Sequence, residues 1–227
     1  GFNNQGVDYL VENLKKRRYT GIVGTNVGKQ KDTPIDQAAS DYAICIEKVF
    51  DHCDYITINI SSPNTKNLRA LQDQGHLAEL LSELVGLRNR LAEKHQTHRP
   101  MLIKIAPDWE EAALIQALET IGASGIDGLI ATNTTLDRQA VKDHPHAHET
   151  GGLSGRPVTQ ASNHALEVAR QILGPEFPLV GVGGIASGAD AAKKHQLGAD
   201  LVQIYTGLIY EGPKLIKECV AAWPKTR

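Results

Sequence analysis

The sequence predicts an α/β protein whose strands form one parallel sheet. Short apolar runs rich in β-branched residues alternate six times with amphipathic stretches along the 227 residues. The runs are nearly uniformly apolar, which is typical of strands covered on both faces. No linker or low-complexity tract interrupts this pattern, so we expect one domain spanning 1–227.

The strands are expected where the apolar runs are shortest and richest in Val and Ile. The first is 21–24, which runs into TNVG, and the others are 55–60, 100–105, 128–132, 178–182 and 201–205. Repeated strand–helix units of this kind predict right-handed crossover connections.

The stretches around the strands carry helix signals. VDYLVENLKK (7–16) precedes the first strand, and Thr33-Pro34 places a cap and a first-turn proline before IDQAASDYAICIEKVF. Leucines at helical spacing mark HLAELLSELVGLRNRLAEK (76–94), and Pro107-Asp108 precedes WEEAALIQALETI, which has acidic residues in its first turn. Further helices are expected at 161–173, 188–197 and 213–223.

Two architectures are compatible with six such units. A closed (β/α)8 barrel of the TIM type needs eight strands and about 250 residues. The chain also opens on the loop Gly1-Phe2-Asn3-Asn4, with no strand before it. The protein is therefore either a small, open, doubly wound sheet, or a (β/α)8 barrel with about six of its eight β-α units in this chain and its first two lacking.

Polar residues follow all six strands and favour the barrel. The strand endings are TNVGK, NISSPN, LIKIAPD, ATNTT, GVGGI and IYTG. In a β/α barrel the carboxyl ends of the strands form the active-site face. The amides of Asn26, Asn59, Asn64 and Asn133 each offer a donor and an acceptor, which suits a planar heterocycle.

Lys104 lies inside an apolar strand, near its end. A lysine there is costly unless it meets an anion or an electron-rich ring. It is either a salt-bridged edge residue or a cation beside a cofactor that accumulates negative charge.

Glycines after the last two strands predict a phosphate site. Gly183-Gly184 and Thr206-Gly207 expose backbone N–H groups, and GGLSGRP (151–157) could fold over a ligand, with Gly155 donating its N–H. GVGGIASG lacks the G-x-G-x-x-G spacing of a dinucleotide fold, and no nucleotide triphosphatase P-loop is present.

Composition excludes several classes of protein. The net charge of -2 implies no attraction to nucleic acid or anionic lipid. No apolar run reaches the roughly 18 residues of a membrane span, and no signal peptide is visible. Cys45, Cys53 and Cys219 lack metal-site spacing and are expected to be free thiols in a reducing cytoplasm. The alternating histidines of DHPHAHE are interpreted as a solvated loop, so no metal is expected.

Taken together, these stretches resemble the dihydroorotate dehydrogenases, and most closely the quinone-dependent class. GFNNQGVD, GTNVGKQKDTP, INISSPNT, IKIAPD, IATNTTLDR, TGGLSGRP, VGVGGI and LVQIYTG occur in the family's order. The resemblance implies a β/α barrel that holds FMN, with orotate stacked on the flavin. It also implies oxidation of dihydroorotate to orotate, with FMN as hydride acceptor and a quinone as final electron acceptor, in de novo pyrimidine biosynthesis.

Site residues follow from the resemblance by position. It implies Ser62 as the catalytic base. Because a serine hydroxyl is a poor base at its free pKa, it needs a water or hydroxyl chain that carries the proton away, and Ser61 and Thr134 are candidates near such a chain. Substrate binding is implied for Asn59, Asn64, Asn133 and Thr134. Contacts with FMN are implied for Asn26, Asn59, Lys104, Thr132, Gly155, Gly184, Tyr205 and Thr206.

The family's proteins also have parts that this sequence does not show. These are an N-terminal membrane-associating helical segment, and two β-α units that carry a glycine-rich flavin loop and a substrate-binding lysine. We therefore interpret the chain as the C-terminal portion of an enzyme that is peripheral to the cytoplasmic side of the inner membrane. The alternatives are another FMN-dependent barrel that reduces or oxidises a pyrimidine, or a non-catalytic barrel fragment.

Overall fold

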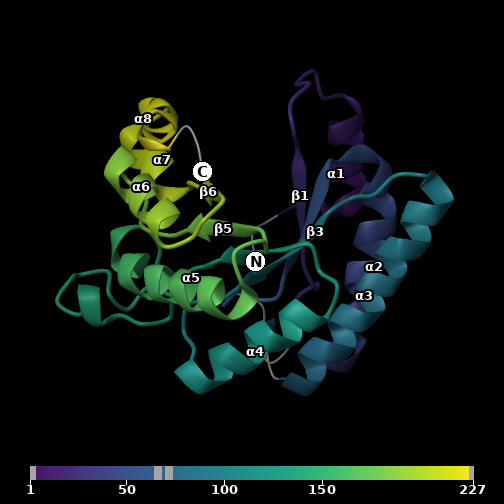
Figure 1. Ribbon diagram of the computed structural model, residues 1–227, viewed down its shortest axis with the longest axis horizontal. Coiled ribbons are helices and arrows are strands. Elements are labelled where there is room, and N and C mark those ends of the chain that lie inside the picture. Colours follow the sequence, from purple (N-terminus) through teal and green to yellow (C-terminus); the bar gives the residue numbers. More distant parts are fainter. Residues whose placement is uncertain (1–3, 64–67, 70–73, 225–227) are drawn as a thin grey trace.

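A single parallel sheet organises the protein (Figure 1). The computed structural model describes residues 4–63, 68–69 and 74–224. The strands are β1 (Gly24–Val27), β2 (Tyr55–Asn59), β3 (Met101–Ile105), β4 (Gly128–Ala131), β5 (Leu179–Val182) and β6 (Leu201–Gln203). Their spatial order, β1-β2-β3-β4-β5-β6, is their order in the chain. Because this order never reverses, the sheet is not doubly wound, and it curls into a half-barrel as the barrel prediction requires.

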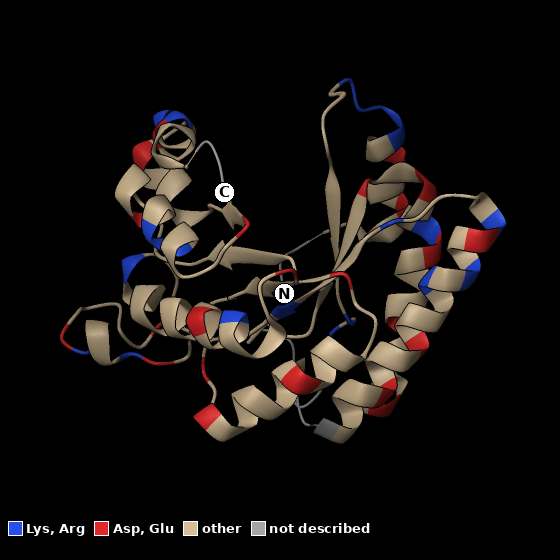
Figure 2. Cartoon of the chain, in the orientation of Figure 1, with Lys and Arg blue, Asp and Glu red and all other residues tan. Residues whose placement is uncertain are grey.

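Helices cover the convex side of the sheet (Figure 1). Helix α1 (Gly6–Lys15) precedes β1, and α7 (Thr206–Glu211) and α8 (Lys214–Ala222) follow β6. The crossovers contain α2 (Ala38–Val49), α3 (Gln74–His95), α4 (Glu111–Ala123), α5 (Thr159–Leu173) and α6 (Gly188–Gln196). Short 3-10 turns lie at Ile35–Gln37, Phe50–His52, Gln139–Val141 and Arg156–Val158. Acidic and basic residues are interspersed along the helices (Figure 2).

The predicted strand boundaries need correction at both ends of the sheet. The first strand was expected at 21–24, yet β1 begins only at Gly24. Asp54 fixes Val23, the residue before β1. The Asp54 Oδ2 accepts the Val23 N–H at 2.8 Å, and the Asp54 N–H donates to the Val23 carbonyl at 2.8 Å. The last strand ends at Gln203 because Tyr205 already flanks α7, a six-residue helix that the sequence pattern did not predict.

Burial on the sheet alternates more than the apolar runs predict. In β3, Met101, Ile103 and Ile105 are buried, whereas Leu102 and Lys104 are only half-buried. In β1, alternate residues are exposed. In β6, Leu201 and Gln203 are exposed. The prediction that both faces are fully covered is therefore wrong for β1, β3 and β6: the helices seal the convex face, and part of the concave face stays accessible.

Two apolar clusters hold the helices to the sheet. The larger one joins strand residues such as Ile56 and Ile103 to helix residues such as Tyr42, Leu81 and Leu118. The smaller one consists of Ile185, Ala191, Leu215 and Cys219. At roughly 25 cal/mol for each Å² of apolar surface removed from water, such burial supplies the main force that holds the crossovers in place.

The three cysteines are free thiols, as predicted. Cys53 and Cys219 are buried and Cys45 is half-buried, and burial raises the pKa of each thiol. Within the described ranges, no helix is long and apolar enough to cross a membrane. The same ranges contain no group of three or more His, Cys, Asp or Glu side chains placed to hold a metal ion.

Candidate active site

A cavity of about 770 Å³ opens at the carboxyl ends of the strands. This volume falls within the usual range for small-molecule and cofactor sites. Residues predicted for the site that line it are Asn26, Asn59, Ser62, Lys104, Thr132, Asn133, Thr134, Gly155, Gly184, Tyr205 and Thr206. The predicted substrate residue Asn64 lies outside the described residues. The structure therefore brings every described residue of the predicted catalytic, substrate-binding and FMN-binding sets to one cavity, although they span residues 26–206 of the chain.

The register of the sheet explains this convergence. Asn59 ends β2 and is paired with Lys104 of β3. The Asn133 N–H donates to the carbonyl of Ile105 at 2.8 Å, which ties the residues after β4 to the end of β3. From the convex side, the buried Tyr42 hydroxyl donates to the Asn59 carbonyl at 2.8 Å. Backbone contacts thus set the polar strand ends side by side before any ligand is present.

A buried serine orients the two amides at this edge. The Ser61 hydroxyl is fully buried and donates to Asn59 Oδ1 at 3.0 Å, while it accepts from Asn133 Nδ2 at 3.0 Å. Asn59 Oδ1 also accepts from Asn133 Nδ2 at 3.2 Å and from the Ser61 N–H at 3.1 Å. The side-chain oxygen Oδ1 of Asn133 accepts the Thr134 N–H at 2.9 Å. With its oxygen engaged in this way, Asn59 presents an N–H donor to a ligand.

This geometry changes the interpretation of Ser61. The sequence predicts Ser61 near a chain that carries a proton away from Ser62. Its hydroxyl is instead committed to the two amides, so its contacts orient Asn59 and Asn133. Ser62, by contrast, is half-buried and lines the cavity together with Lys104 and Asn133.

Lys104 reaches the cavity from the concave face of β3. Its Nζ donates to Gln203 Oε1 of β6 at 3.3 Å, and burial lowers the pKa of the ammonium group. No carboxylate of the described residues lies within ion-pair distance of this ammonium. Of the two interpretations of Lys104, the salt-bridged edge residue therefore receives no support from the structure.

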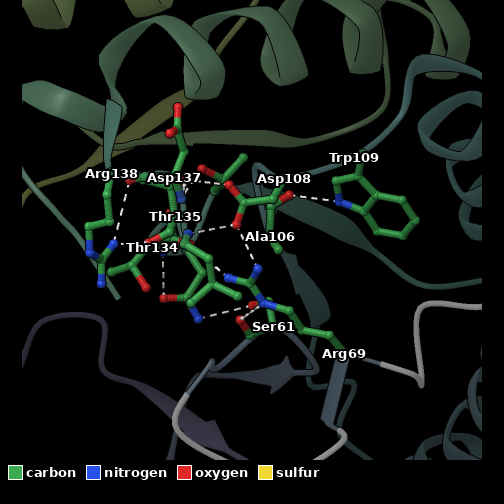
Figure 3. A network of polar contacts seen from close by, with 12 residues as sticks. Ser61, Arg69, Ala106, Asp108, Trp109, Thr134, Thr135, Asp137 and Arg138 are labelled. Carbon is green, nitrogen blue, oxygen red and sulfur yellow. Dashed lines mark hydrogen bonds and ion pairs between the residues drawn. The ribbon is translucent and has the colours of Figure 1, made fainter. Parts of the chain in front are cut away.

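An arginine that no sequence motif indicates joins three loops of the site (Figure 3). Arg69 Nε donates to the Ser61 carbonyl at 3.3 Å, and its Nη2 donates to the Thr134 carbonyl at 3.0 Å. Its Nη1 pairs with Asp108 Oδ2 at 2.6 Å. Arg69 thus links the loops that follow β2, β3 and β4.

Asp108 completes this link. It accepts hydrogen bonds from the Thr135 hydroxyl and from the Leu136 N–H, the latter at 3.0 Å. The sequence predicts that Asp108 lies at a helix start, but α4 begins at Glu111 and its flanking residue is Glu110. The position of Asp108 shortly after β3, at the same edge as the other polar residues, could have identified it as a site residue from the sequence.

Glycines form the opposite wall of the cavity. Gly183 and Gly184 have φ values of +113° and +76°, which side chains other than glycine rarely adopt. A Cβ on Gly184 would lie 1.8 Å from Thr159 Oγ1, and one on Gly155 would lie 3.0 Å from Thr206 Cγ2. We call Gly155, Gly183, Gly184 and Thr206 the glycine cradle. Backbone N–H groups in such a wall can be approached closely by a phosphate.

The fold and the site define a β/α-barrel protein with a ligand cavity at the carboxyl ends of its strands, which is the active-site face of such barrels. The family model for dihydroorotate dehydrogenase matches residues 1–225, and the chain belongs to this family.

Curated relatives carry the name dihydroorotate dehydrogenase (quinone). One from Cupriavidus pinatubonensis is 51% identical over 225 residues, which cover 98% of this chain and 65% of that protein. One from Burkholderia pseudomallei is 53% identical over 222 residues, with the same coverage of 98% and 65%. The chain therefore spans just under two thirds of the length of these relatives.

Solved structures give the same relationship. The crystal structure of DHODH in complex with ferulenol from Eimeria tenella matches with a TM-score of 0.88 and 32% identity, over 96% of this chain and 63% of that chain. The ligand-free type from the same organism matches with a TM-score of 0.87 and 33% identity, over 96% of this chain and 65% of that one.

Proposed function

We propose that the protein containing this chain oxidises dihydroorotate to orotate, with FMN as hydride acceptor and a quinone as final electron acceptor, in de novo pyrimidine biosynthesis. The observation that carries the proposal is the convergence of a hydroxyl, an ammonium and paired amides on one cavity. These groups belong to Ser62, Lys104, Asn59 and Asn133. The names of the relatives and the family membership of the chain support the same reaction.

The residues present fit FMN. The glycine cradle offers backbone N–H groups to the phosphate, and a Cβ on Gly184 would lie 1.8 Å from Thr159 Oγ1, so a side chain there would displace this wall. Lys104 has no carboxylate partner among the described residues, so it can offset negative charge on a ring system beside it. The remaining FMN contacts are proposed for Asn26, Asn59, Thr132 and Tyr205, which line the same cavity. Bound FMN would supply the hydride acceptor.

Ser62 is proposed as the base that removes the proton from the carbon beside the substrate carbonyl. A serine hydroxyl is a weak base at its ordinary pKa, so positioning must provide much of the effect. The oriented amides of Asn59 and Asn133, together with Thr134, are proposed to hold the pyrimidine ring so that this carbon faces Ser62. A substrate contact is also proposed for Asn64.

Two further β-α units are proposed to close the barrel between β6 and β1. Apolar side chains are exposed near both edges of the sheet: Ile22 is 77% exposed beside β1, and Leu201 of β6 is 65% exposed. The additional length of the relatives is sufficient for such units. By the family resemblance, we also propose that the full-length protein associates peripherally with the cytoplasmic side of the inner membrane.

The proposed reaction is tested in the full-length protein with Ser62→Ala. We expect the variant to retain its flavin and to lose nearly all oxidation of dihydroorotate with a soluble quinone. Ser40→Ala, an exposed serine on α2, is the matched control and should keep full activity. Near-normal turnover by Ser62→Ala would remove Ser62 from the role of base.

Flavin titration and turnover assays of the full-length parent protein distinguish the alternative functions. A non-catalytic fragment would show no saturable FMN binding. Flavin binding without turnover of dihydroorotate, but with turnover of another dihydropyrimidine, would favour the other FMN-dependent barrels.

A further inference from the structure

A lysine is buried behind the glycine cradle. Lys194 lies on α6 and is only 1% exposed, and its Nζ donates to the Ser162 hydroxyl of α5 at 2.6 Å. Ser162 is itself fully buried. The salt bridges of the described residues include none to Lys194. An ammonium group without a carboxylate partner is costly in such a place, so its burial calls for a physical explanation.

The surrounding charges do not neutralise this ammonium group. The carboxylate of Asp190, one turn earlier on α6, raises the pKa of Lys194 and so opposes the larger effect of burial. Its Oδ2, however, accepts hydrogen bonds from Ser187 Oγ at 2.8 Å and from the Ala186 N–H at 3.0 Å. On α5, Arg170 pairs with Asp200 at 2.7 Å, and that carboxylate also accepts the Leu179 N–H at the start of β5. Both carboxylates are therefore engaged elsewhere.

Ser162 connects Lys194 to the cavity wall. An ammonium group only donates, so the Ser162 hydroxyl accepts from Lys194 and gives its own proton to a carbonyl oxygen. The carbonyls of Gly183 and Thr159 lie 3.2 Å and 3.1 Å from Ser162 Oγ. A Cβ on Gly183 would lie only 2.8 Å from the same oxygen. The serine therefore packs directly beneath the turn that lines the cavity.

The stem of Lys194 runs along β5 toward this turn. A Cβ on Gly181 would lie 3.1 Å from both Cβ and Cδ of Lys194, so the absence of a side chain at that position makes room for the stem. Gly181 lies two residues before Gly183. A positive charge held in a poorly solvated interior acts over a longer range than a charge at the surface, because water does not screen it.

We propose that Lys194 and Ser162 form a positioning pair for the anion end of the cavity: they fix the Gly183–Gly184 turn and supply buried positive charge that favours a phosphoryl group over a neutral ligand. The pair acts through the turn and does not itself touch the ligand. This proposal rests on the proposed function, because that function places a phosphate at the glycine cradle.

The test compares FMN with riboflavin, which carries the same ring system without the phosphate. Dissociation constants are measured for both ligands with full-length apoprotein, in the parent protein and in Lys194→Met. We expect Lys194→Met to weaken FMN binding by roughly tenfold, the effect of losing one favourable charge interaction of modest size. Riboflavin binding should stay within about twofold of the parent value, because it has no phosphate to respond to this charge.

Two further variants sharpen the result. Lys193→Met removes the same charge from the neighbouring exposed residue of α6 and should change neither constant. Ser162→Ala keeps the ammonium group but cuts its link to the Gly183 carbonyl, and should also weaken FMN binding selectively. If Lys194→Met does not fold, the comparison of FMN and riboflavin affinities is made with Ser162→Ala instead.

The possible failures are distinguishable. An equal loss of affinity for FMN and riboflavin in both variants would reduce the pair to a purely structural role and overturn the proposal. Unchanged FMN binding in both variants would overturn it as well. If the parent protein itself binds FMN no better than riboflavin, the proposed phosphate site fails, and with it the function on which this inference rests.

Discussion

Replacing Lys194 by methionine should leave the protein at least as stable at neutral pH while it weakens the binding of the phosphate. Methionine matches the length of the lysine stem and has no charge to desolvate. Exchanging buried charged groups for apolar ones of similar volume is often neutral or stabilising. The structure therefore predicts that stability and ligand binding change in different directions at this position.

The magnitude follows from the pKa of Lys194. Burial lowers it from 10.5 to about 8. Between these two values the unfolded chain holds a proton that the folded protein has released, so the folded state gains stability as the pH rises. Below the folded pKa the cost of burial is fully present, and it is removed as the pH rises through 8 toward 10.5. Linkage gives a gain of about 2.5 kcal/mol between pH 7 and pH 10.

Denaturant unfolding at both pH values measures this difference. The parent protein should gain about 2.5 kcal/mol relative to Lys194→Met between pH 7 and pH 10, because the titrations of all other groups cancel in the comparison. Lys193→Met, which removes an exposed ammonium group, should run parallel to the parent. A constant difference between parent and Lys194→Met at the two pH values would show that the ammonium is not desolvated, and the reasoning would fail.

Three further substitutions test the site itself in the full-length protein. Arg69→Ala removes the link between three loops and should lower kcat for dihydroorotate roughly tenfold or more with flavin content unchanged, measured by steady-state kinetics. Gly184→Ala places a Cβ 1.8 Å from Thr159 Oγ1 and should yield protein without flavin absorbance. Ser61→Ala frees the paired amides and should raise KM for dihydroorotate several-fold while the flavin stays bound, since one buried hydrogen bond contributes about 1 kcal/mol. Parent-like values in any of these assays would contradict the corresponding contact.

Much of the fold is predictable because the crossovers leave a strong pattern. Apolar runs separated by amphipathic stretches identify all six strands to within a few residues, and polar strand ends favour a barrel over an open sheet. The errors arise where tertiary contacts override the pattern. The Asp54 carboxylate binds the Val23 N–H and delays β1 to Gly24, and α7 is too short, at six residues, to display a helical period.

The lining of the cavity is predictable for a related reason, and the groups behind the lining are not. Parallel strands deliver their last residues to one edge, so a motif at each strand end predicts a shared site. Arg69 meets Asp108 across 39 residues, and Lys194 meets Ser162 across 32. In AAKKHQ, Lys193 is exposed and Lys194 is buried, and local periodicity cannot distinguish two adjacent lysines at the edge of an apolar face.

At each end of the cavity, a buried serine bridges two polar groups by hydrogen bonds. Ser61 accepts a hydrogen bond from one amide and donates to another, and Ser162 accepts from an ammonium group and donates to a backbone carbonyl. A hydroxyl can do both at once, whereas an ammonium only donates and a carbonyl only accepts. Each serine therefore converts two groups on different elements into one fixed unit. Among the described residues, these hydrogen bonds do not join one unit to the other. Loosening one end should therefore leave the geometry of the other intact, and the substrate and phosphate ends can be tested separately.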